Sequence, residues 1–386
     1  MTDPTASFDA LTTAAVRSQK WTRYPDAIGA FVAEMDFGTA PEVTRALHAA
    51  VDDGALGYLP DAAAAAMAEA CAAFQQRRYG WAVPASWVTP LADVLAGLRA
   101  AIEHFTPPGS PVVLPTPAYM PFLLLPGQLG REILQVPMVP GPAGRLVHDL
   151  DGLDRAFAAG GRLLVHCSPH NPTGRVFTDA EHLAIAEVVE RHPGVRVLAD
   201  EVHAPLTHPG AVHRPYAALS EVTAAHAVTA TSASKAWNIP GLKAAQFVVS
   251  NDADAEHWAS VGFPFSLGAS VLGVLANTAA YTDGEEWLAD VLGYLDGNRR
   301  LLAELLAEQL PAVRYTPPEG TYLAWLDCRE LGIEGAPAQH FLQRAGVALI
   351  DGAECGAGGA GHVRLNLATP RPVLRTIVAR MAASLR

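Results

Sequence analysis

Cysteine is scarce in this chain, and its spacing excludes two common ways of stabilising a fold. Only four of the 386 residues are cysteine (Cys71, Cys167, Cys328 and Cys355), and no two of them form a C-x-x-C pair. We therefore expect neither a disulfide framework nor a structural zinc site, and we expect a reducing cytoplasm as the location. The histidines show no H-E-x-x-H or similar spacing, so the sequence predicts no metal site.

Positive charge and long apolar runs are also in short supply. The chain carries 27 lysines and arginines against 39 acidic residues, a formal net charge of −12. Nucleic acids and anionic membranes select basic surfaces, so neither is an expected partner. No apolar run approaches the length of a membrane span, and the first residues lack the cationic and apolar stretches of a secretory signal.

The chain does have enough apolar residues for a large interior, since 50% of its residues are hydrophobic, and its length predicts two domains. Its middle part alternates short apolar runs with helical stretches, a pattern typical of an α/β fold with a mostly parallel sheet. One helix is expected at Asp179–Arg191, with Thr178 as its N-cap. The expected strands are Pro111–Leu114, Leu163–Cys167, Val195–Ala199, Ala227–Ala230 and Gln246–Ser250.

The C-terminal part of the chain has a different order of elements. A long helical pattern extends from Ser266 to Gln309 and is broken near Asp283–Gly284. The elements expected after it, strand, helix, strand and helix, are Tyr322–Leu326, Pro337–Ala345, Val363–Leu367 and Val373–Leu385. This order predicts a smaller α+β unit. We expect a large domain over residues 46–280 and a small domain that combines residues 1–45 with residues 281–386.

Lys235 is the first candidate for chemistry, because it directly follows an expected strand in the segment Thr231-Ser-Ala-Ser-Lys235. A lone lysine after small residues is most often a solvated surface residue. Here Ser232 and Ser234 place two hydroxyl groups before the lysine, and Lys243 adds a second cation after it. This arrangement suits a lysine that forms a Schiff base beside a phosphate group.

Two more polar segments also follow expected strands, where α/β folds place their ligands. Asp200 begins the segment D-E-V-H, and Asn171 lies in S-P-H-N-P-T-G-R. An isolated Asp at this place is about as often a turn or cap residue, and the Asn segment is rich in turn formers. In the functional interpretation, Asp200 keeps a pyridinium nitrogen protonated and Asn171 donates a hydrogen bond to the 3′ oxygen of the same ring.

Arg364 lies inside an apolar strand, in the segment H-V-R-L-N-L. Arginine is rarely buried without an anionic partner, because desolvating its charge is costly. A substrate carboxylate bound by both arms of the guanidinium would supply that partner. We therefore expect Arg364 to bind the carboxylate of an amino-acid substrate.

The order of these motifs, N-P-x-G-R, D-E-x-H, S-x-S-K and V-R-L-N, resembles that of fold-type I pyridoxal 5′-phosphate (PLP) enzymes in the class I/II aminotransferase superfamily. Further segments narrow the resemblance to the cystathionine β-lyase and C–S β-lyase branch; they include Ala33-Glu-Met-Asp-Phe37, Thr116-Pro-Ala-Tyr119 and Pro318-Glu-Gly-Thr-Tyr-Leu-Ala-Trp-Leu-Asp327. The likeness covers nearly the whole chain. It implies the aspartate aminotransferase-like fold, with a large PLP domain and a small α+β domain.

The resemblance also assigns roles to matching residues. Tyr119 would stack on the pyridine ring, and His203 would lie near its 3′ oxygen. Tyr58 would reach the phosphate of the neighbouring subunit, which implies a homodimer with shared active sites. The remaining phosphate contacts would come from Ser232, Ser234, Lys243 and the backbone N–H groups of Ala92, Asp93 and Val94 at a helix start.

Some positions depart from the family pattern. Lys243 stands at a position where the family often has arginine. A single ammonium group therefore replaces a guanidinium, which could donate two parallel hydrogen bonds to the phosphate. Asp93 places a carboxylate beside the expected phosphate loop, and we expect it to point away. Phe31 replaces the usual tryptophan, and an aromatic residue is missing near Glu354 and Cys355. We expect these three residues to line the substrate end of the site.

The implied reaction is α,β-elimination from a cysteine S-conjugate, which yields a thiol, pyruvate and ammonia, with Lys235 removing the α-proton. An aminotransferase shares every cofactor residue, so only the branch-specific segments favour the lyase. A more distant alternative is a PLP-binding regulator without turnover. The acidic charge and the presence of both Lys235 and Arg364 argue against that alternative.

Overall fold

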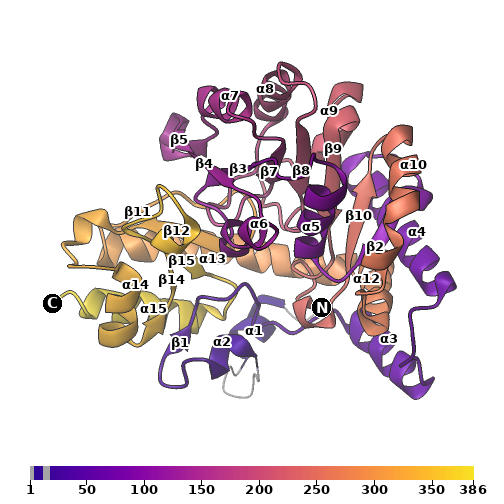
Figure 1. Ribbon diagram of the computed structural model, residues 1–386. Coiled ribbons are helices and arrows are strands. Elements are labelled where there is room, and N and C mark those ends of the chain that lie inside the picture. Colours follow the sequence, from indigo (N-terminus) through magenta and orange to yellow (C-terminus); the bar gives the residue numbers. More distant parts are fainter. Residues whose placement is uncertain (1–3, 12–17) are drawn as a thin grey trace.

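The structure is a computed structural model, and it describes residues 4–11 and 18–386. Two main β-sheets organise the chain (Figure 1). The larger sheet comes from the middle of the sequence and has helices on both faces, whereas the smaller sheet comes from the C-terminal part. The N-terminal segment lies beside the smaller sheet, so segments from both ends of the chain meet in space.

In the described part of the chain, seven strands form the larger sheet, in the order β2-β10-β9-β8-β7-β3-β4. All neighbours from β9 to β4 are parallel, while β10 runs antiparallel to both β9 and β2. The predicted α/β fold with a mostly parallel sheet is therefore confirmed. The strands are β2 (Val88–Leu91), β3 (Val112–Thr116), β4 (Ile133–Pro137), β7 (Leu163–Cys167), β8 (Arg196–Asp200), β9 (Ala227–Thr231) and β10 (Ala245–Val249).

The five strands predicted in this region correspond to β3, β7, β8, β9 and β10, with ends that differ by at most two residues. The edge strand β4 and the strand β2 at the opposite edge were not predicted. Both contain a proline, and most of the residues of β4 are not buried. Edge strands tolerate proline and need only one neighbour, so they lack the continuous apolar signal of central strands.

Side chains of the central strands alternate between two cores, one on each face of the larger sheet. In β8, Val197 and Ala199 pack into one core, while Leu198 packs into the other. In β7, Leu164 and Val165 likewise point to opposite faces. Because both faces are covered, these strands are apolar at nearly every position, as expected of a parallel sheet.

Helices supply the other half of each core. The helices α5 (Val94–His104) and α10 (Asp252–Val261) contribute to the core on one face. The core on the opposite face is built from α4 (Asp61–Tyr79), α7 (Leu150–Ala158) and α8 (Asp179–Glu190). The shorter or more peripheral helices are α1 (Pro4–Asp9), α2 (Gln19–Thr22), α3 (Pro41–Asp52), α6 (Leu125–Gln128), α9 (Glu221–His226) and α11 (Phe263–Ser266).

The predicted start of α8 is confirmed. The Thr178 hydroxyl accepts a hydrogen bond from the backbone N–H of Glu181 at 3.3 Å, and the Glu181 carboxylate accepts one from the backbone N–H of Thr178 at 2.8 Å. This reciprocal pair is a capping box, which satisfies two backbone donors at a helix N-terminus.

The predicted break in the long helical region is also confirmed. It separates α12 (Val271–Asp283) from α13 (Glu285–Gln309) at Gly284. A side chain at Gly284 would overlap the indole of Trp237, whose Nε1–H donates to the Gly284 carbonyl at 2.9 Å. No helix in the described residues is both long enough and apolar enough to cross a bilayer.

The smaller sheet is antiparallel, with the strand order β11-β12-β15-β14. Its strands are β11 (Arg314–Tyr315), β12 (Leu323–Asp327), β14 (Ile350–Asp351) and β15 (His362–Asn366). The helix expected at 337–345 is α14 (Pro337–His340) followed by one wider turn, and the last predicted helix is α15 (Arg371–Ala383). A short hairpin of β5 (Val139–Pro140) and β6 (Leu146–Val147) lies apart from both sheets.

The N-terminal segment is fixed to the C-terminal part by backbone and ionic contacts. The strand β1 (Ile28–Gly29) pairs with β13 (Val347–Ala348) in parallel. The buried Lys20 amine donates to the Asp36 carboxylate at 2.9 Å and to the Ala368 carbonyl at 3.2 Å. The expected small domain also includes residues 1–3 and 12–17, which lie outside the described residues.

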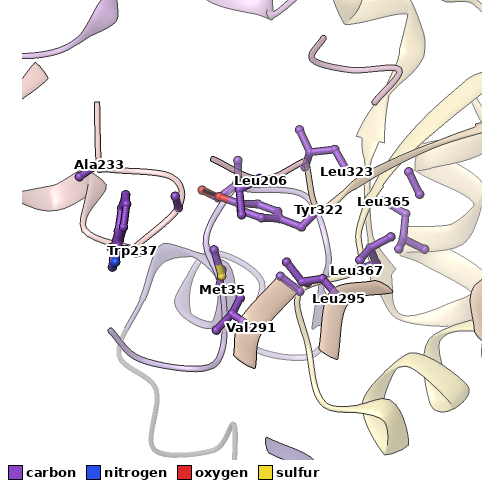
Figure 2. Packing of buried hydrophobic residues seen from close by; sticks show 14 of the residues in the cluster. Met35, Leu206, Ala233, Trp237, Val291, Leu295, Tyr322, Leu323, Leu365 and Leu367 are labelled. Carbon is purple, nitrogen blue, oxygen red and sulfur yellow. Dashed lines mark hydrogen bonds between the residues drawn. The ribbon is translucent and has the colours of Figure 1, made fainter. Parts of the chain in front are cut away.

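One apolar core joins the smaller sheet to the larger one (Figure 2). Tyr322 from the edge of β12 lies between Leu206, which follows β8, and Leu295 of α13. Trp237, which follows β9, belongs to the same core. Fully burying each such side chain contributes roughly 1.5–3 kcal/mol, so this shared core holds the two sheets in a fixed relation.

A group of buried histidines lies in the core beside α8. His166 on β7 and His182 on α8 form a hydrogen bond between ring nitrogens at 2.9 Å, and both rings are at most 1% exposed. Burial lowers the pKa values of His170 and His182 to about 3 and that of His226 to about 4. These histidines are therefore neutral in the folded protein across the physiological pH range.

This burial predicts a loss of stability in mild acid. Below the unfolded-state pKa near 6.5, the unfolded chain binds protons that the folded chain does not, because the folded pKa values are lower. Each such histidine then lowers the free energy of unfolding by about 1.4 kcal/mol per pH unit down to its folded pKa. Urea unfolding at pH 7.5, 6.0 and 5.0 measures this slope. His182→Gln should reduce it, whereas the exposed-site control His48→Gln should not.

Candidate active site

A cavity of about 510 Å³ lies where the C-terminal ends of the parallel strands face the smaller sheet. Most of the residues singled out from the sequence line it, although they come from segments between residues 31 and 364. The predicted residues in its wall are Phe31, Ala92, Asp93, Val94, Tyr119, Asn171, Asp200, His203, Ser234, Lys235, Lys243, Glu354 and Arg364. The structure thus brings separate sequence motifs together at one site.

The register of the larger sheet explains why these residues meet. In β7, β8 and β9, Cys167 pairs with Asp200 and Asp200 pairs with Ala230, so the three strands end at the same level. The chain then leaves each strand at the same edge of the sheet, where Asn171, Asp200 and Lys235 converge. This is the edge at which parallel α/β sheets bind ligands.

Asp200 is a buried carboxylate at the cavity wall, with 3% of its surface exposed. One of its oxygens accepts a hydrogen bond from the backbone N–H of Val202 at 3.2 Å. Burial raises the pKa of Asp200 to about 6, against the opposing effects of this hydrogen bond, the Cys167 thiol and the Lys235 charge. A cation placed beside Asp200 would stabilise its ionised form.

Lys235 lies in the same cavity, and no carboxylate among the described residues forms a salt bridge with it. Its amine donates to the Ala33 carbonyl at 3.2 Å. Burial lowers the pKa of this amine to about 8, and the charge of Arg364 acts in the same direction. A lysine with a lowered pKa has a larger neutral fraction near pH 7, and the neutral amine is the form that acts as a nucleophile or a base.

Arg364 on β15 has the features expected of a site for a carboxylate. It is 2% exposed and donates to the Asn171 side-chain oxygen at 2.9 Å and to the Phe31 carbonyl at 2.7 Å. Its Nε is buried without a hydrogen-bond partner, and its guanidinium has no carboxylate partner among the described residues. A buried cation paired only with neutral oxygens is suited to bind an anion from outside the chain.

Asp93 and Lys243 lie at the start of α5. The Asp93 carboxylate caps α5 through the backbone N–H of Ala96 at 3.0 Å, and its other oxygen contacts the Lys243 amine at 2.9 Å. We expected Asp93 to point away from the phosphate loop, but the structure turns it toward Lys243. The helix cap holds it there, so Lys243 is shared between Asp93 and any anion bound at this helix start.

Tyr119 and His203 complete the polar wall. The Tyr119 ring packs edge-to-face against Phe122 at 5.3 Å, and burial raises the pKa of its hydroxyl. His203 is 2% exposed, and burial lowers the pKa of its ring well below the usual value. Its Nδ1 has no hydrogen-bond partner among the described residues, so a polar atom is free to face a ligand.

Three predicted residues are not part of the cavity wall. Ser232 is buried, where its hydroxyl donates to the Ala244 carbonyl at 2.7 Å and accepts from the backbone N–H of Ser234 at 2.9 Å. The Cys355 side chain is fully buried. Tyr58 is 98% exposed and borders a different hollow on the surface.

The cavity wall also contains residues that the sequence did not single out. Gln19, Arg23 and Tyr24 reach it from the N-terminal segment, and Leu124 reaches it from the turn after β3. No local pattern marks the three N-terminal residues, because they reach the cavity only through the packing of their segment against β13. Among the described residues, no group of three or more histidines, cysteines or carboxylates is arranged to hold a metal ion.

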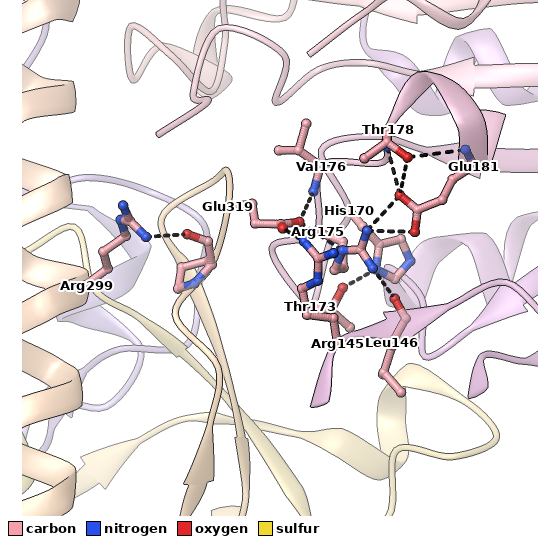
Figure 3. Close-up of polar contacts among 11 residues, drawn as sticks. Arg145, Leu146, His170, Thr173, Arg175, Val176, Thr178, Glu181, Arg299 and Glu319 are labelled. Atoms are coloured by element: carbon pink, nitrogen blue, oxygen red, sulfur yellow. Dashed lines mark hydrogen bonds and ion pairs between the residues drawn. The ribbon is translucent and has the colours of Figure 1, made fainter. Parts of the chain in front are cut away.

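Arg175, the last residue of the N-P-x-G-R motif, lies outside the cavity and is a structural anchor (Figure 3). It is 4% exposed and donates to Glu319 at 2.9 Å, to both oxygens of Glu181 at 2.8 and 2.9 Å, and to the Leu146 carbonyl at 2.7 Å. These contacts join the loop that carries Asn171 to α8 and to the loop before β12. Arg175 thus fixes the loop that carries the wall residue Asn171, although Arg175 itself does not line the cavity.

The desolvated amine of Lys235 predicts that the site is maintained at the expense of stability. For the cofactor-free protein at pH 7, we expect Lys235→Met to raise the Tm, because it keeps the aliphatic stem and removes a desolvated charge. Since the folded pKa of about 8 lies below the unfolded value of 10.5, the advantage should shrink between pH 8 and pH 10.5.

Lys20→Met is the matched contrast, because Lys20 is buried against Asp36 and its loss removes the positive charge that pairs with this carboxylate, which then retains the neutral Trp21 indole as a donor. Thermal unfolding should show a lower Tm for this variant. A Tm for Lys235→Met that is well below that of the parent protein would show that the Lys235 amine stabilises the fold.

Comparisons with known proteins bear on the family of this chain. The model of the aminotransferase class I and II family matches residues 28–381. A cystathionine β-lyase of Corynebacterium glutamicum is 39% identical over 96% of this chain and 97% of its own length. A Mycobacterium tuberculosis protein, provisionally assigned as a cystathionine β-lyase, is 42% identical over 95% of this chain and 94% of its own.

A solved structure extends this likeness to three dimensions. It comes from Corynebacterium diphtheriae and is provisionally assigned as a PLP-dependent β-cystathionase. It superposes with a TM-score of 0.91 at 40% identity, over 97% of both chains. By family model, sequence relatives and structure alike, the chain belongs to the class I and II aminotransferase family.

Proposed function

We propose that this protein is a PLP-dependent C–S β-lyase, which cleaves cystathionine or another cysteine S-conjugate to a thiol, pyruvate and ammonia. The observation that carries the proposal is the convergence of Lys235, Asp200 and Arg364 on one cavity. A nucleophilic amine, a buried carboxylate and a cation without a carboxylate partner are the groups that a PLP enzyme for amino acids needs. The names of the closely similar relatives favour the lyase within this family.

The residues of the cavity fit PLP. The buried carboxylate of Asp200 has no cationic group in hydrogen-bond contact among the described residues. Its pKa is raised by burial, so a neighbouring cation would stabilise the ionised carboxylate. A protonated pyridine nitrogen is such a cation. The free Nδ1 of His203 and the amide of Asn171 lie in the same wall and would face the 3′ oxygen of the ring.

The phosphate of the cofactor fits the opposite end of the wall. The N-terminus of α5 presents the backbone N–H groups of residues 92–94, and Ser234 and Lys243 lie beside it. A helix N-terminus favours an anion through its free N–H groups and its dipole. We propose that Ser232, whose hydroxyl is used inside the loop, supports the position of Ser234 without contacting the phosphate.

The cofactor, when bound, supplies an electron sink for the negative charge that develops on the substrate α-carbon. Arg364 holds the substrate carboxylate, and Asp200 keeps the ring nitrogen protonated. The Lys235 amine accepts the proton from the α-carbon, a role that its pKa of about 8 suits because the neutral form is accessible near pH 7. Tyr119, His203 and Phe31 line the wall around these groups.

We also propose that the active unit is a homodimer. Tyr58 is 98% exposed, and neighbouring apolar side chains are exposed as well, with Leu56 at 68%, Phe263 at 71% and Leu267 at 66%. All four border one hollow near the start of α12. A contiguous exposed apolar patch of this kind supports a protein–protein contact, and a second copy of the chain is the partner that the family resemblance implies.

We also propose a division into two domains and a cytoplasmic location. A large domain of residues 46–280 would contain the whole larger sheet, and a small domain of residues 1–45 and 281–386 would contain the whole smaller sheet. All four cysteines are buried free thiols, which supports a reducing cytoplasmic location.

The reaction type is tested with PLP-loaded protein and L-cystathionine. We expect steady release of pyruvate, ammonia and thiol in equal amounts without any added 2-oxo acid, because loss of the thiolate is effectively irreversible. Lys235→Ala should reduce the rate by at least about 10²–10⁴-fold, the range for loss of a general base. Turnover that stops after one equivalent and resumes only with a 2-oxo acid would identify an aminotransferase.

The shared active site is tested by mixing two inactive variants. Tyr58→Ala removes the contact to the neighbouring phosphate, and Lys235→Ala removes the catalytic amine. If each site combines Tyr58 from one subunit with Lys235 from the other, hybrid dimers contain one intact site. After subunit exchange, an equal mixture should recover about a quarter of the parent activity, because half of the dimers are hybrids. A fully active monomer by light scattering would contradict the proposal.

A further inference from the structure

Two ionic side chains of opposite charge line the exposed end of the cavity, where the chemistry at Lys235 does not use them. Arg23 follows α2, and Glu354 lies on the 3₁₀ turn Gly352–Cys355. Both residues are exposed, in contrast to the buried Asp200 and Arg364. In the part of the chain that the structure describes, neither Arg23 nor Glu354 forms an ion pair.

The wall near these two ions is apolar. Tyr24 and Phe31 pack edge-to-face with ring centres 5.3 Å apart, and Leu124 lines the cavity as well. The guanidinium of Arg23 lies 5.8 Å from the centre of the Tyr24 ring. A substrate that is held by its carboxylate at Arg364 therefore places its remaining atoms among apolar side chains and two charged groups, Arg23 and Glu354, that form no salt bridge within the described residues.

We propose that Arg23 and Glu354 determine which thiol group the enzyme releases. They select S-conjugates whose thiol part carries a carboxylate and an ammonium group of its own, with Arg23 binding the carboxylate and Glu354 binding the ammonium. A purely apolar thiol part would reduce the hydration of both ions without pairing either, and this mismatch disfavours its binding. The inference rests on the proposed lyase function and adds the residues that read the distal end of the substrate.

Three S-conjugates separate the two charges. S-(2-carboxyethyl)-L-cysteine carries only the distal carboxylate, S-(2-aminoethyl)-L-cysteine carries only the distal ammonium, and L-cystathionine carries both. The kcat and KM for pyruvate release are measured with PLP-loaded parent protein, Arg23→Gln and Glu354→Gln. Both substitutions keep polarity and approximate size while removing the charge.

For Arg23→Gln, we expect kcat/KM for the carboxyethyl substrate to fall about two- to five-fold relative to the aminoethyl substrate, as for loss of an exposed ion pair. Glu354→Gln should show the opposite preference, and both variants should lose kcat/KM for L-cystathionine. The losses should appear in KM, because these residues lie away from the reacting atoms. Arg45→Gln is the control, since Arg45 is an exposed arginine paired with Glu42 outside the cavity.

The outcomes distinguish this inference from the proposed function. If each variant changes kcat/KM for the two singly charged substrates by the same factor, so that their ratio stays at the parent value, then Arg23 and Glu354 do not bind the distal charges. If the parent protein releases pyruvate from none of the three substrates, the lyase function itself is wrong, and the inference that rests on it fails too.

Discussion

The buried guanidinium of Arg175 is the contact on which the geometry of this protein most depends. It binds Glu181 at the start of α8 and Glu319 before β12, so one side chain connects the larger sheet to the approach of the smaller sheet. Desolvated arginine is stable only when its donors are satisfied, so removing either carboxylate would leave part of a buried positive charge uncompensated. The loop of Asn171, and through it Arg364, therefore has little freedom to move.

The charged groups of the cavity differ from Arg175 in how they are paired. Arg175 donates four hydrogen bonds, whereas Asp200, Lys235 and Arg364 are all desolvated, and none of these three forms a salt bridge within the part of the chain that the structure describes. Their pKa values shift in the direction that disfavours charge, with Asp200 raised and Lys235 lowered. A ligand that brings a positive ring nitrogen, an electrophilic carbon and a carboxylate resolves all three mismatches together. Binding of the cofactor and substrate is therefore favoured because they bring opposite charges to side chains that lack them in the free protein.

The sequence predicted the central part of this architecture and much of the site because both depend on local signals. Apolar runs mark the buried strands, and polar residues directly after them, such as Asp200 and Lys235, mark the ligand-binding edge. The strands β2 and β4 escaped prediction because edge positions tolerate proline and exposure. Arg23 could not be found from the sequence, because only tertiary packing brings it to the cavity, and the exposure of Tyr58 has meaning only if a second subunit is considered.

The pairing of the two ends of the chain has a consequence for how the protein is made. Residues 20–36 contact residues 346–368 through β1, β13 and the Lys20 contacts, so their partners are synthesised more than three hundred residues later. At about 5–20 residues per second, the N-terminal segment waits roughly 15–70 seconds on the ribosome without them. Arg364, which donates to the Phe31 carbonyl in the folded protein, is also made only at that late stage. The cavity, and with it the capture of a cofactor, therefore cannot form before residues 346–368 have been synthesised.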